Sequence, residues 1–242
     1  MDITKVTKPA RKVLNLKLKR CGAVIVAGGS ASRMGGIDKV MAPLAGVPLI
    51  VHSLRAFQEC DAISEIVVVT REDLIEKITG LSKEFSKVTA VVAGGSTRQE
   101  SVHRGLNTLS AKVKLAAIHD GARPLITWQV IDRAVRAANT YGAAAPAIPV
   151  KDTIKVVAGG MVKETPDRKT LQAVQTPQVF DFDMLRAAHK KLAQDGVEVT
   201  DDCAALERMG MSVKIVEGDE RNLKVTTPMD LKIAELLMEE AR

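Results

Sequence analysis

Aromatic residues are scarce in this chain of 242 residues, which has one tryptophan, one tyrosine and four phenylalanines. Proteins that bind single-stranded nucleic acids commonly stack bases on aromatic rings within a basic groove. Residues 1–20 carry seven Lys and Arg against one Asp, whereas the other 222 residues carry 28 charges of each sign. The net charge of +6 therefore belongs to a basic N-terminal extension, residues 1–20, and we expect no nucleic-acid partner.

Cysteines and long apolar segments are also few. Cys21, Cys60 and Cys203 are far apart and form no C-x-x-C pair, which argues against a disulfide framework or a zinc site. No apolar run approaches the ~18–20 residues that cross a bilayer. The N-terminal extension lacks the apolar core of a secretory signal. We predict a cytoplasmic protein without a membrane partner, although a basic, acid-poor leader is also compatible with organelle targeting.

Short apolar runs rich in β-branched residues alternate with helical patterns along the first part of the chain. This alternation predicts right-handed βαβ crossovers, and hence an α/β fold with a mostly parallel twisted sheet and helices on both faces. The expected strands are Ala23–Ala27, Glu65–Thr70, Val88–Ala93, Leu115–His119 and Ala143–Val150. The expected helices are Leu49–Phe57, Glu72–Thr79, Arg98–Leu109 and Trp128–Tyr141.

The alternation of strand and helix patterns stops after Pro149. Two short strand-like pieces flank Gly159-Gly160, which predicts a projecting β-hairpin arm at about residues 151–170. A projecting arm often pairs with a second subunit, so we expect a homodimer formed through it. The tail predicts a helix near Asp183–Gln194, a helix start at Thr200-Asp-Asp, a strand at Ser212–Val216 and a last helix from Thr227-Pro228. We take residues 21–242 as one domain that carries this arm.

A glycine-rich loop follows the first expected strand, at Gly28–Lys39. Small side chains let successive backbone N–H groups converge on an anion, and Arg33 and Lys39 supply positive charge. The loop matches neither G-x-x-x-x-G-K-[ST] nor G-x-G-x-x-G. It predicts a triphosphate site; the alternative is an ordinary strand-to-helix turn with two solvated cations.

Two more polar segments follow expected strands, where ligands bind in open α/β sheets. Gly94 and Gly95 allow close approach to the backbone, and Ser101 adds a hydroxyl; the alternative is an ordinary loop and helix start. Asp120 is a candidate Mg²⁺ ligand, because magnesium takes one or two carboxylates and completes its shell with phosphate and water, or it simply forms a turn. Arg123 is placed to hold Asp120 or a phosphate.

Seven segments in this order and spacing resemble the 2-C-methyl-D-erythritol 4-phosphate cytidylyltransferase family over roughly residues 22–240. They are Gly29-Ser-Ala-Ser-Arg-Met with Lys39, Arg98-x-x-Ser-Val102, His119-Asp-Gly-Ala-Arg-Pro124, Lys151-Asp-Thr-Ile-Lys155, Gln175-Thr-Pro-Gln178, Thr200-Asp-Asp202 and Asn222-Leu-Lys-Val-Thr226. The resemblance implies a Rossmann-like nucleotidyltransferase that joins CTP to 2-C-methyl-D-erythritol 4-phosphate in non-mevalonate isoprenoid biosynthesis. Ala31, where relatives usually have glycine, and Ser96, often acidic in relatives, depart from the pattern.

The resemblance also implies roles for individual residues. Arg33 and Lys39 match the residues that hold the triphosphate of CTP, and Asp120 matches the Mg²⁺-binding and substrate-contacting aspartate. Lys224 matches a position associated with the methylerythritol phosphate, and we expect it to act with Arg33 and Lys39 as a catalytic cation. Ala27, Gly28, Gly95 and Ser101 match the cytosine-recognition positions, and Arg168, Thr176 and Thr200 match positions associated with the methylerythritol phosphate. With Asp120, and with Gly29 of the loop and Arg123 from the sequence itself, these are the expected substrate-binding residues. Family members place the arm across a homodimer, so Arg168 would serve the partner's site.

The expected mechanism is nucleotidyl transfer: the acceptor phosphate attacks the α-phosphorus of CTP in line, and pyrophosphate leaves. His119 is expected to be structural, because side chains alternate along a strand and Asp120 faces the ligand. One alternative is a sister cytidylyltransferase for another polyol phosphate, such as ribitol 5-phosphate. A remote alternative is a non-catalytic nucleotide- or nucleic-acid-binding protein that uses the leader.

Overall fold

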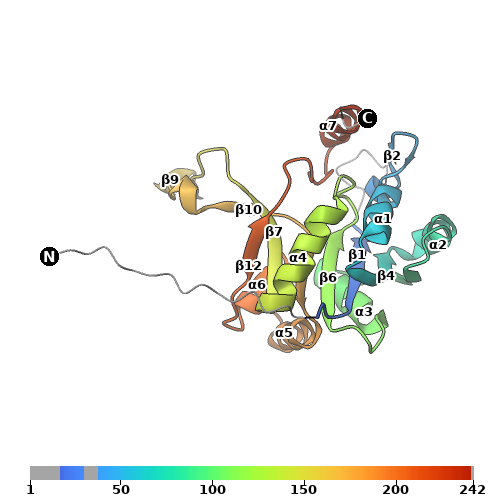
Figure 1. The fold of residues 1–242 in the computed structure, drawn as a ribbon. Coiled ribbons are helices and arrows are strands. Elements are labelled where there is room, and N and C mark those ends of the chain that lie inside the picture. The colour runs from blue at the N-terminus through green and yellow to red at the C-terminus, as the bar shows by residue number, and fades with distance from the viewer. Residues whose placement is uncertain (1–16, 30–37, 241–242) are drawn as a thin grey trace, which may run out of the picture.

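A single large sheet forms the centre of the molecule (Figure 1). The computed structural model describes residues 17–29 and 38–240. Within that part of the chain the sheet has eight strands, in the order β10-β7-β11-β6-β1-β4-β5 with β12 on the other side of β7. The strands are β1 (Cys21–Ala27), β4 (Ile63–Thr70), β5 (Val88–Ala93), β6 (Leu115–Asp120), β7 (Ala143–Pro149), β10 (Gln172–Val174), β11 (Gln178–Asp181) and β12 (Lys214–Glu217).

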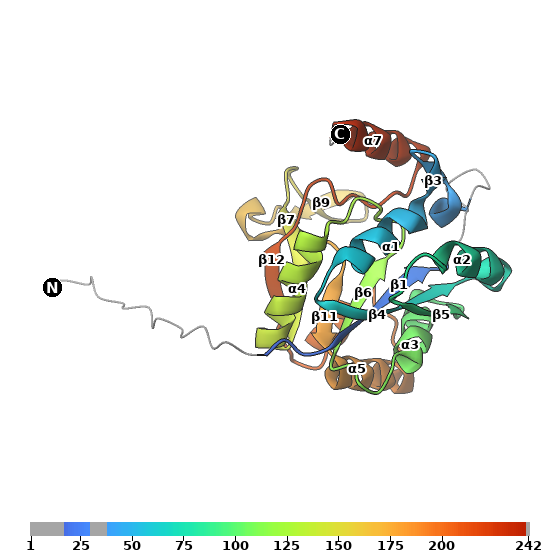
Figure 2. The same cartoon turned by 45° about the vertical axis from the view of Figure 1, so that its right-hand side comes forward.

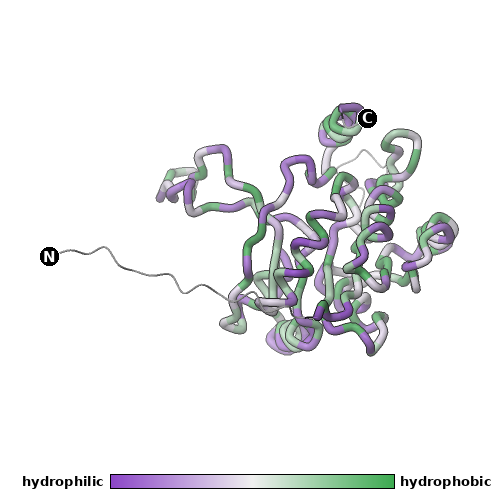
Figure 3. The backbone as a smooth tube through the Cα atoms, in the orientation of Figure 1, coloured by the Kyte–Doolittle hydropathy of each residue, from purple (hydrophilic) through white to green (hydrophobic). Residues whose placement is uncertain are grey.

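The central strands are parallel, as predicted. β1 pairs in parallel with both β4 and β6, and Val24 has Val67 and Ile118 as its neighbours in register. All three of these side chains are fully buried. Strands covered on both faces are apolar throughout rather than alternating, which explains the near-continuous Val, Ile and Ala of these segments. Figure 3 shows the resulting concentration of hydrophobic residues along the central strands.

Helices cover both faces of the sheet, which confirms the predicted three-layer α/β architecture (Figure 2). One face packs on α1 (Leu49–Glu59) and α4 (Trp128–Tyr141) around Phe57 and Ile131, and α2 (Ile75–Ser82) lies beside α1. The other face packs on α3 (Arg98–Thr108), α5 (Phe182–Asp195) and α6 (Asp202–Glu207) around Leu106 and Leu185. The sheet therefore separates two apolar cores, and its strand ends remain available for a site.

Two strands of the large sheet were not predicted, and neither were the two-residue strands β2 (Pro43–Leu44) and β3 (Val47–Pro48) of a separate small hairpin. β10 and β11 pair antiparallel with successive parts of β7, and β11 also pairs with β6. They are three and four residues long and are separated by Gln175-Thr-Pro177, with a cis Thr176–Pro177 peptide. These strands are short, a proline lies between them, and all three residues of β10 are exposed, so their sequence has no alternation of buried and exposed residues. The alternation of strand and helix patterns therefore revealed the parallel strands but not the antiparallel strands β10 and β11.

The predicted arm is present. β8 (Val156–Ala158) and β9 (Met161–Glu164) form an antiparallel hairpin that projects from the sheet beside β10 (Figure 1). Gly159 and Gly160 have φ of +58° and +76°, and two consecutive positive φ values are typical of a tight hairpin turn. Val157, Met161 and Val162 on the arm are more than half exposed.

The last helix, α7 (Pro228–Glu239), begins as predicted, with Pro228 at its first position. Thr227 accepts a hydrogen bond from Asp230 N, and the Asp230 carboxylate accepts one from Thr227 N, which forms a capping box. The helix packs near the small hairpin of β2 (Pro43–Leu44) and β3 (Val47–Pro48), around the buried Leu44. Within the described ranges, no helix is both long enough and apolar enough to cross a bilayer.

Candidate active site

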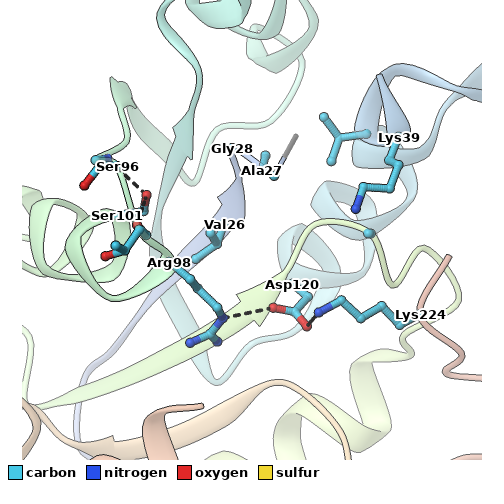
Figure 4. A pocket seen from close by; sticks show the side chains of 14 residues that line it. Val26, Ala27, Gly28, Lys39, Ser96, Arg98, Ser101, Asp120 and Lys224 are labelled. Carbon is cyan, nitrogen blue, oxygen red and sulfur yellow. Dashed lines mark hydrogen bonds and ion pairs between the residues drawn. The ribbon is translucent and has the colours of Figure 1, made fainter. Parts of the chain in front are cut away.

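A pocket of about 310 Å³ opens where β1, β5 and β6 end (Figure 4). Its walls come from five separate parts of the chain: the end of β1, the short 3₁₀ helix at Lys39–Met41, the loop that leads into α3, the end of β6 with the turn after it, and the segment before α7. The lining residues are Val26, Ala27, Gly28, Gly29, Lys39, Val40, Gly95, Ser96, Thr97, Arg98, Ser101, Asp120, Ala122 and Lys224. The three strand-end segments singled out in the sequence therefore meet in one cavity.

The β1 end of the pocket is held to its neighbouring strands by backbone contacts. Thr70 Oγ1 donates to Ala27 O over 3.3 Å, and Gly121 N donates to Val26 O over 2.9 Å. Gly28 lies against Thr70, where an added Cβ would be 3.7 Å from the Thr70 carbonyl carbon. The first two residues of the glycine-rich loop thus leave β1 in a fixed direction toward the pocket.

Lys39 is the first residue of a 3₁₀ helix that ends the glycine-rich loop. Asp38 caps this helix by accepting from Val40 N over 3.0 Å, and Arg71 at the end of β4 forms an ion pair with Asp38. The Lys39 ammonium points into the cavity (Figure 4), and a Cβ built on Gly29 would lie 3.8 Å from Lys39 Nζ. The lysine charge therefore lies beside the backbone of the predicted phosphate loop. Arg33 and Ala31 lie outside the described residues.

A side chain at Gly94 would clash with the buried Ser101, and one at Gly95 would displace the Glu100 side chain. A Cβ at Gly94 would lie 2.7 Å from Ser101 Oγ, and one at Gly95 would lie 2.2 Å from the Glu100 carboxyl carbon. Ser101 Oγ accepts from Gly95 N over 3.0 Å and donates to Thr97 O over 2.9 Å. The predicted Ser101 hydroxyl thus shapes the loop that lines the pocket and itself contributes to the wall.

Asp120 ends β6 at the pocket floor, with three cations around its carboxylate. Lys224 Nζ is 2.8 Å from Oδ2, Arg98 Nε is 3.5 Å from Oδ1, and Arg123 Nε is 3.9 Å from Oδ2. Burial alone would raise the pKa of Asp120, but the charges of Lys224 and Arg98 outweigh it and lower the pKa to about 2. The carboxylate is therefore ionised at neutral pH.

Lys224 reaches Asp120 because its segment is tied to the strand ends. Val225 N donates to Ala122 O over 2.8 Å, and Asn222 Nδ2 donates to Thr176 O over 3.0 Å. Arg123 Nη1 donates to Asn222 O over 2.7 Å. Arg123 therefore braces the segment that carries Lys224, in addition to facing Asp120.

Thr176 and His119 lie behind Asp120 rather than in the pocket. Thr176 Oγ1 accepts from Asp120 N over 3.1 Å and is 3.0 Å from His119 Nδ1. His119 is fully buried, with its ring centroid 4.9 Å from that of Phe57, and burial lowers its pKa to about 3. The imidazole is neutral at physiological pH, which fits the structural role predicted for it.

Four predicted substrate-binding residues are not among the lining residues of the pocket: Arg123 and Thr176, which contact Asp120, and Arg168 and Thr200, which do not in the described part of the chain. Arg168 is exposed at the base of the arm, where its Nη1 donates to Lys151 O over 2.8 Å. Thr200 is exposed just before α6, whose N-cap is Asp201. Their roles remain predictions, because this single chain does not bring them into the cavity.

Arg98 is the pocket residue that sequence reasoning left without a role. It is the first residue of α3, and its Nη1 donates to Asp202 Oδ2 over 2.8 Å. The two residues are 104 positions apart, so no local pattern connects them. Their segments, Arg98-x-x-Ser-Val102 and Thr200-Asp-Asp202, did stand out separately in the sequence, but only the fold shows that they meet.

The donor set fits a magnesium ion that is carried largely by phosphate oxygens. Asp120 is the one carboxylate lining the pocket, and within residues 17–29 and 38–240 no cluster of three or more His, Cys, Asp or Glu side chains is suited to hold a metal. Mg²⁺ usually keeps several waters and binds one or two carboxylates plus substrate phosphates. One ionised carboxylate in a pocket lined by backbone and cations therefore matches a metal that enters with a nucleotide.

Comparisons with known proteins agree with this geometry. Residues 21–240 match the family model of 2-C-methyl-D-erythritol 4-phosphate cytidylyltransferase. A protein of that name from Caldanaerobacter subterraneus is 44% identical over 226 residues, which cover 89% of this chain and 97% of that protein. The one from Dehalococcoides mccartyi (strain 195) is 42% identical over 227 residues, covering 93% of this chain and 98% of the relative.

Solved structures lead to the same family. The crystal structure of 4-diphosphocytidyl-2C-methyl-D-erythritol synthase from Anaerococcus prevotii has a TM-score of 0.84 and 28% identity, and covers 91% of this chain and 96% of its own. That of 2-C-methyl-D-erythritol 4-phosphate cytidylyltransferase from Thermus thermophilus has a TM-score of 0.75 and 31% identity, and covers 89% of this chain and 98% of its own. The chain belongs to the 2-C-methyl-D-erythritol 4-phosphate cytidylyltransferase family.

Proposed function

We propose that the pocket at the ends of β1, β5 and β6 joins CTP to 2-C-methyl-D-erythritol 4-phosphate, releasing pyrophosphate, in the non-mevalonate route to isoprenoid precursors. One observation carries the assignment to this pocket: Lys39, Lys224 and the ionised Asp120 converge on a cavity with glycine-rich walls. Nucleotidyl transfer needs positioning and charge neutralisation rather than a protein nucleophile.

The reaction places few demands on acid–base groups. A phosphate monoester has its second pKa near ~6, so the acceptor is already a good nucleophile at neutral pH. The neutral, buried His119 and the ionised Asp120 suit this, since neither has to exchange a proton. Lys39 and Lys224, with Arg33 from the glycine-rich loop, neutralise the charge that develops on the triphosphate.

We assign Mg²⁺ as the divalent cation and Asp120 as its protein ligand. The bound ion supplies positive charge to the phosphates at the reacting end of the nucleotide. Asp120 orients that end, while Ala27, Gly28, Gly95 and Ser101 form the walls against which the cytosine packs. These walls form a narrow base pocket, which favours the smaller pyrimidine ring over a purine.

The acceptor can be tested directly. With CTP as donor, we expect kcat/KM for pyrophosphate release to be at least ~10²-fold higher with 2-C-methyl-D-erythritol 4-phosphate than with ribitol 5-phosphate. A poorly matched acceptor leaves polar groups of the pocket unpaired, and this lowers kcat/KM by at least that factor. The control replaces CTP by UTP or ATP with the same acceptor. Faster release with ribitol 5-phosphate would reassign the acceptor, and no release with either would contradict the enzymatic function.

We further propose a cytoplasmic homodimer in which the arm contributes Arg168 to the partner's site. The exposed apolar side chains of the arm, Val157, Met161 and Val162, would be covered in such a pairing. This places Arg168, which lies outside the pocket of its own chain, within reach of a second pocket.

Mixed subunits test the shared site. Arg168→Ala and Lys39→Ala are each expected to be inactive alone, but their co-expressed heterodimer contains one site with both residues intact. Random assembly should then restore roughly one quarter of wild-type activity. Cross-linking or light scattering confirms the dimer, and a mixed population with no recovered activity contradicts the shared site.

A further inference from the structure

A chain of buried polar contacts connects α5 with the pocket floor. His189 Nε2 lies 3.0 Å from Asp202 Oδ1, and Asp202 Oδ2 accepts from Arg98 Nη1 over 2.8 Å. Arg98 Nε then lies 3.5 Å from Asp120 Oδ1 (Figure 4). His189 and Asp202 are only 2% and 1% exposed and do not line the pocket. Whatever they contribute to the site therefore passes through Arg98.

The Asp202 carboxylate is fixed from the side of the protein core. Asp202 N and Cys203 N donate to Gln178 Oε1 over 3.0 and 3.2 Å, which ties the start of α6 to β11. Burial would raise the pKa of Asp202, but the hydrogen bond from His189 and the charge of Arg98 outweigh it and lower the pKa. A buried ionised carboxylate gives little net stability, so its presence here calls for another reason.

The geometry of Arg98 supplies that reason. Its hydrogen bond to Asp202 is of ordinary length, whereas its distance of 3.5 Å to Asp120 exceeds the 2.7–3.2 Å of a normal N–H···O bond. Asp120 already has Lys224 at 2.8 Å and Arg123 at 3.9 Å. A third cation in full contact would compete with any divalent ion for the same carboxylate.

We propose that Asp202 is a positioning residue for metal binding: it holds the Arg98 guanidinium short of Asp120 and offsets its charge, so that a divalent cation entering with the nucleotide can use Asp120 Oδ1. His189 holds Asp202 in that orientation. The inference rests on the proposed role of Asp120 as metal ligand.

Calorimetric titration with CTP, in Mn²⁺ and separately in EDTA without acceptor, tests this without turnover. The ratio of the two affinities measures the coupling between metal and nucleotide. In Asp202→Asn, Arg98 is released to pair fully with Asp120, so we expect the ratio to fall about tenfold, with CTP affinity in EDTA nearly unchanged. The Mg²⁺ concentration for half-maximal rate should rise in parallel.

Two further variants separate positioning from structural damage. Asp201→Asn is the matched control, because Asp201 caps the same helix by accepting from Ala204 N and also accepts from Gln178 Nε2, but has no contact with Arg98 in the described structure. Its ratio should equal that of the wild type. Adding Arg98→Gln to Asp202→Asn should return the ratio to that of Arg98→Gln alone, since the competing charge is gone.

The outcomes distinguish this inference from the function on which it rests. If metal does not strengthen CTP binding in the wild type, the metal role of Asp120 is wrong. If it does and Asp202→Asn retains the full ratio, the positioning role is overturned while the proposed function stands. A loss that Arg98→Gln does not remove, or that Asp201→Asn shares, also overturns it, because Asp202 would then act on the fold and not through Arg98.

Discussion

Replacing Lys39 by alanine should lower kcat on the order of 10²–10³-fold, the usual cost of removing one group that stabilises developing charge in a water-excluded site. The Lys39 ammonium lies beside Gly29, at the mouth of the predicted phosphate loop, and its helix is held by the Asp38 cap. The variant removes charge from the pocket and leaves that cap intact. Steady-state pyrophosphate release at saturating CTP and acceptor measures the effect.

The control is Lys77→Ala on α2, where the lysine is exposed and is not among the residues that line the pocket. It removes the same charge and should leave kcat unchanged. Circular dichroism and thermal unfolding check that both variants keep the fold. A Lys39→Ala enzyme with near-normal kcat would show that the other groups of the site neutralise the triphosphate without Lys39, and the assignment of Lys39 would be abandoned.

The sequence was informative about the fold wherever one segment carried its own periodic signal. β1, β4, β5, β6 and β7 were found within two residues of their observed bounds, because each carries a nearly continuous apolar run of its own. β10 and β11 were missed since antiparallel pairing to β7 gives them their stability, and that pairing is not written in their own few residues. The hairpin arm was found from Gly159-Gly160 together with the two short strand-like pieces that flank it.

The site was predictable to a similar extent and for a similar reason. Residues at strand ends, such as Lys39 and Asp120, follow from the rule that ligands bind at the carboxyl edge of a parallel sheet. Lys224 required the resemblance to a family, because its place next to Asp120 depends on the contact between Val225 and Ala122, about a hundred residues apart. The pairing of Arg98 with Asp202 has no signal in either segment, since α3 and α6 come together only by packing against the same helix, α5.

Replacing Asp120 by asparagine should lower kcat/KM on the order of 10³-fold, because it removes the one carboxylate that lines the pocket and leaves Lys224, Arg98 and Arg123 facing a neutral group. A loss of metal dependence should accompany the loss of rate: raising Mg²⁺ should not rescue the variant. Asp195→Asn, in an exposed pair with Lys191 on α5, is the control and should leave both quantities unchanged. Restoration by Mg²⁺ would mean that the phosphates alone hold the metal.

The same substitution tests the charge balance independently of catalysis. The pKa of Asp120 is lowered from 3.8 to about 2, so its ionised form stabilises the fold by about 2 kcal/mol relative to a neutral carboxyl, which asparagine imitates. A depressed carboxylate pKa contributes stability above the unfolded-state value and loses it as pH falls through the folded-state value. Urea unfolding should therefore show the variant about 2 kcal/mol less stable at pH 7, with the difference shrinking as the pH falls from about 4 toward 2. A variant that is equally or more stable would show that burying this carboxylate costs more than its three cations return, so that Asp120 is retained for catalysis at the expense of stability.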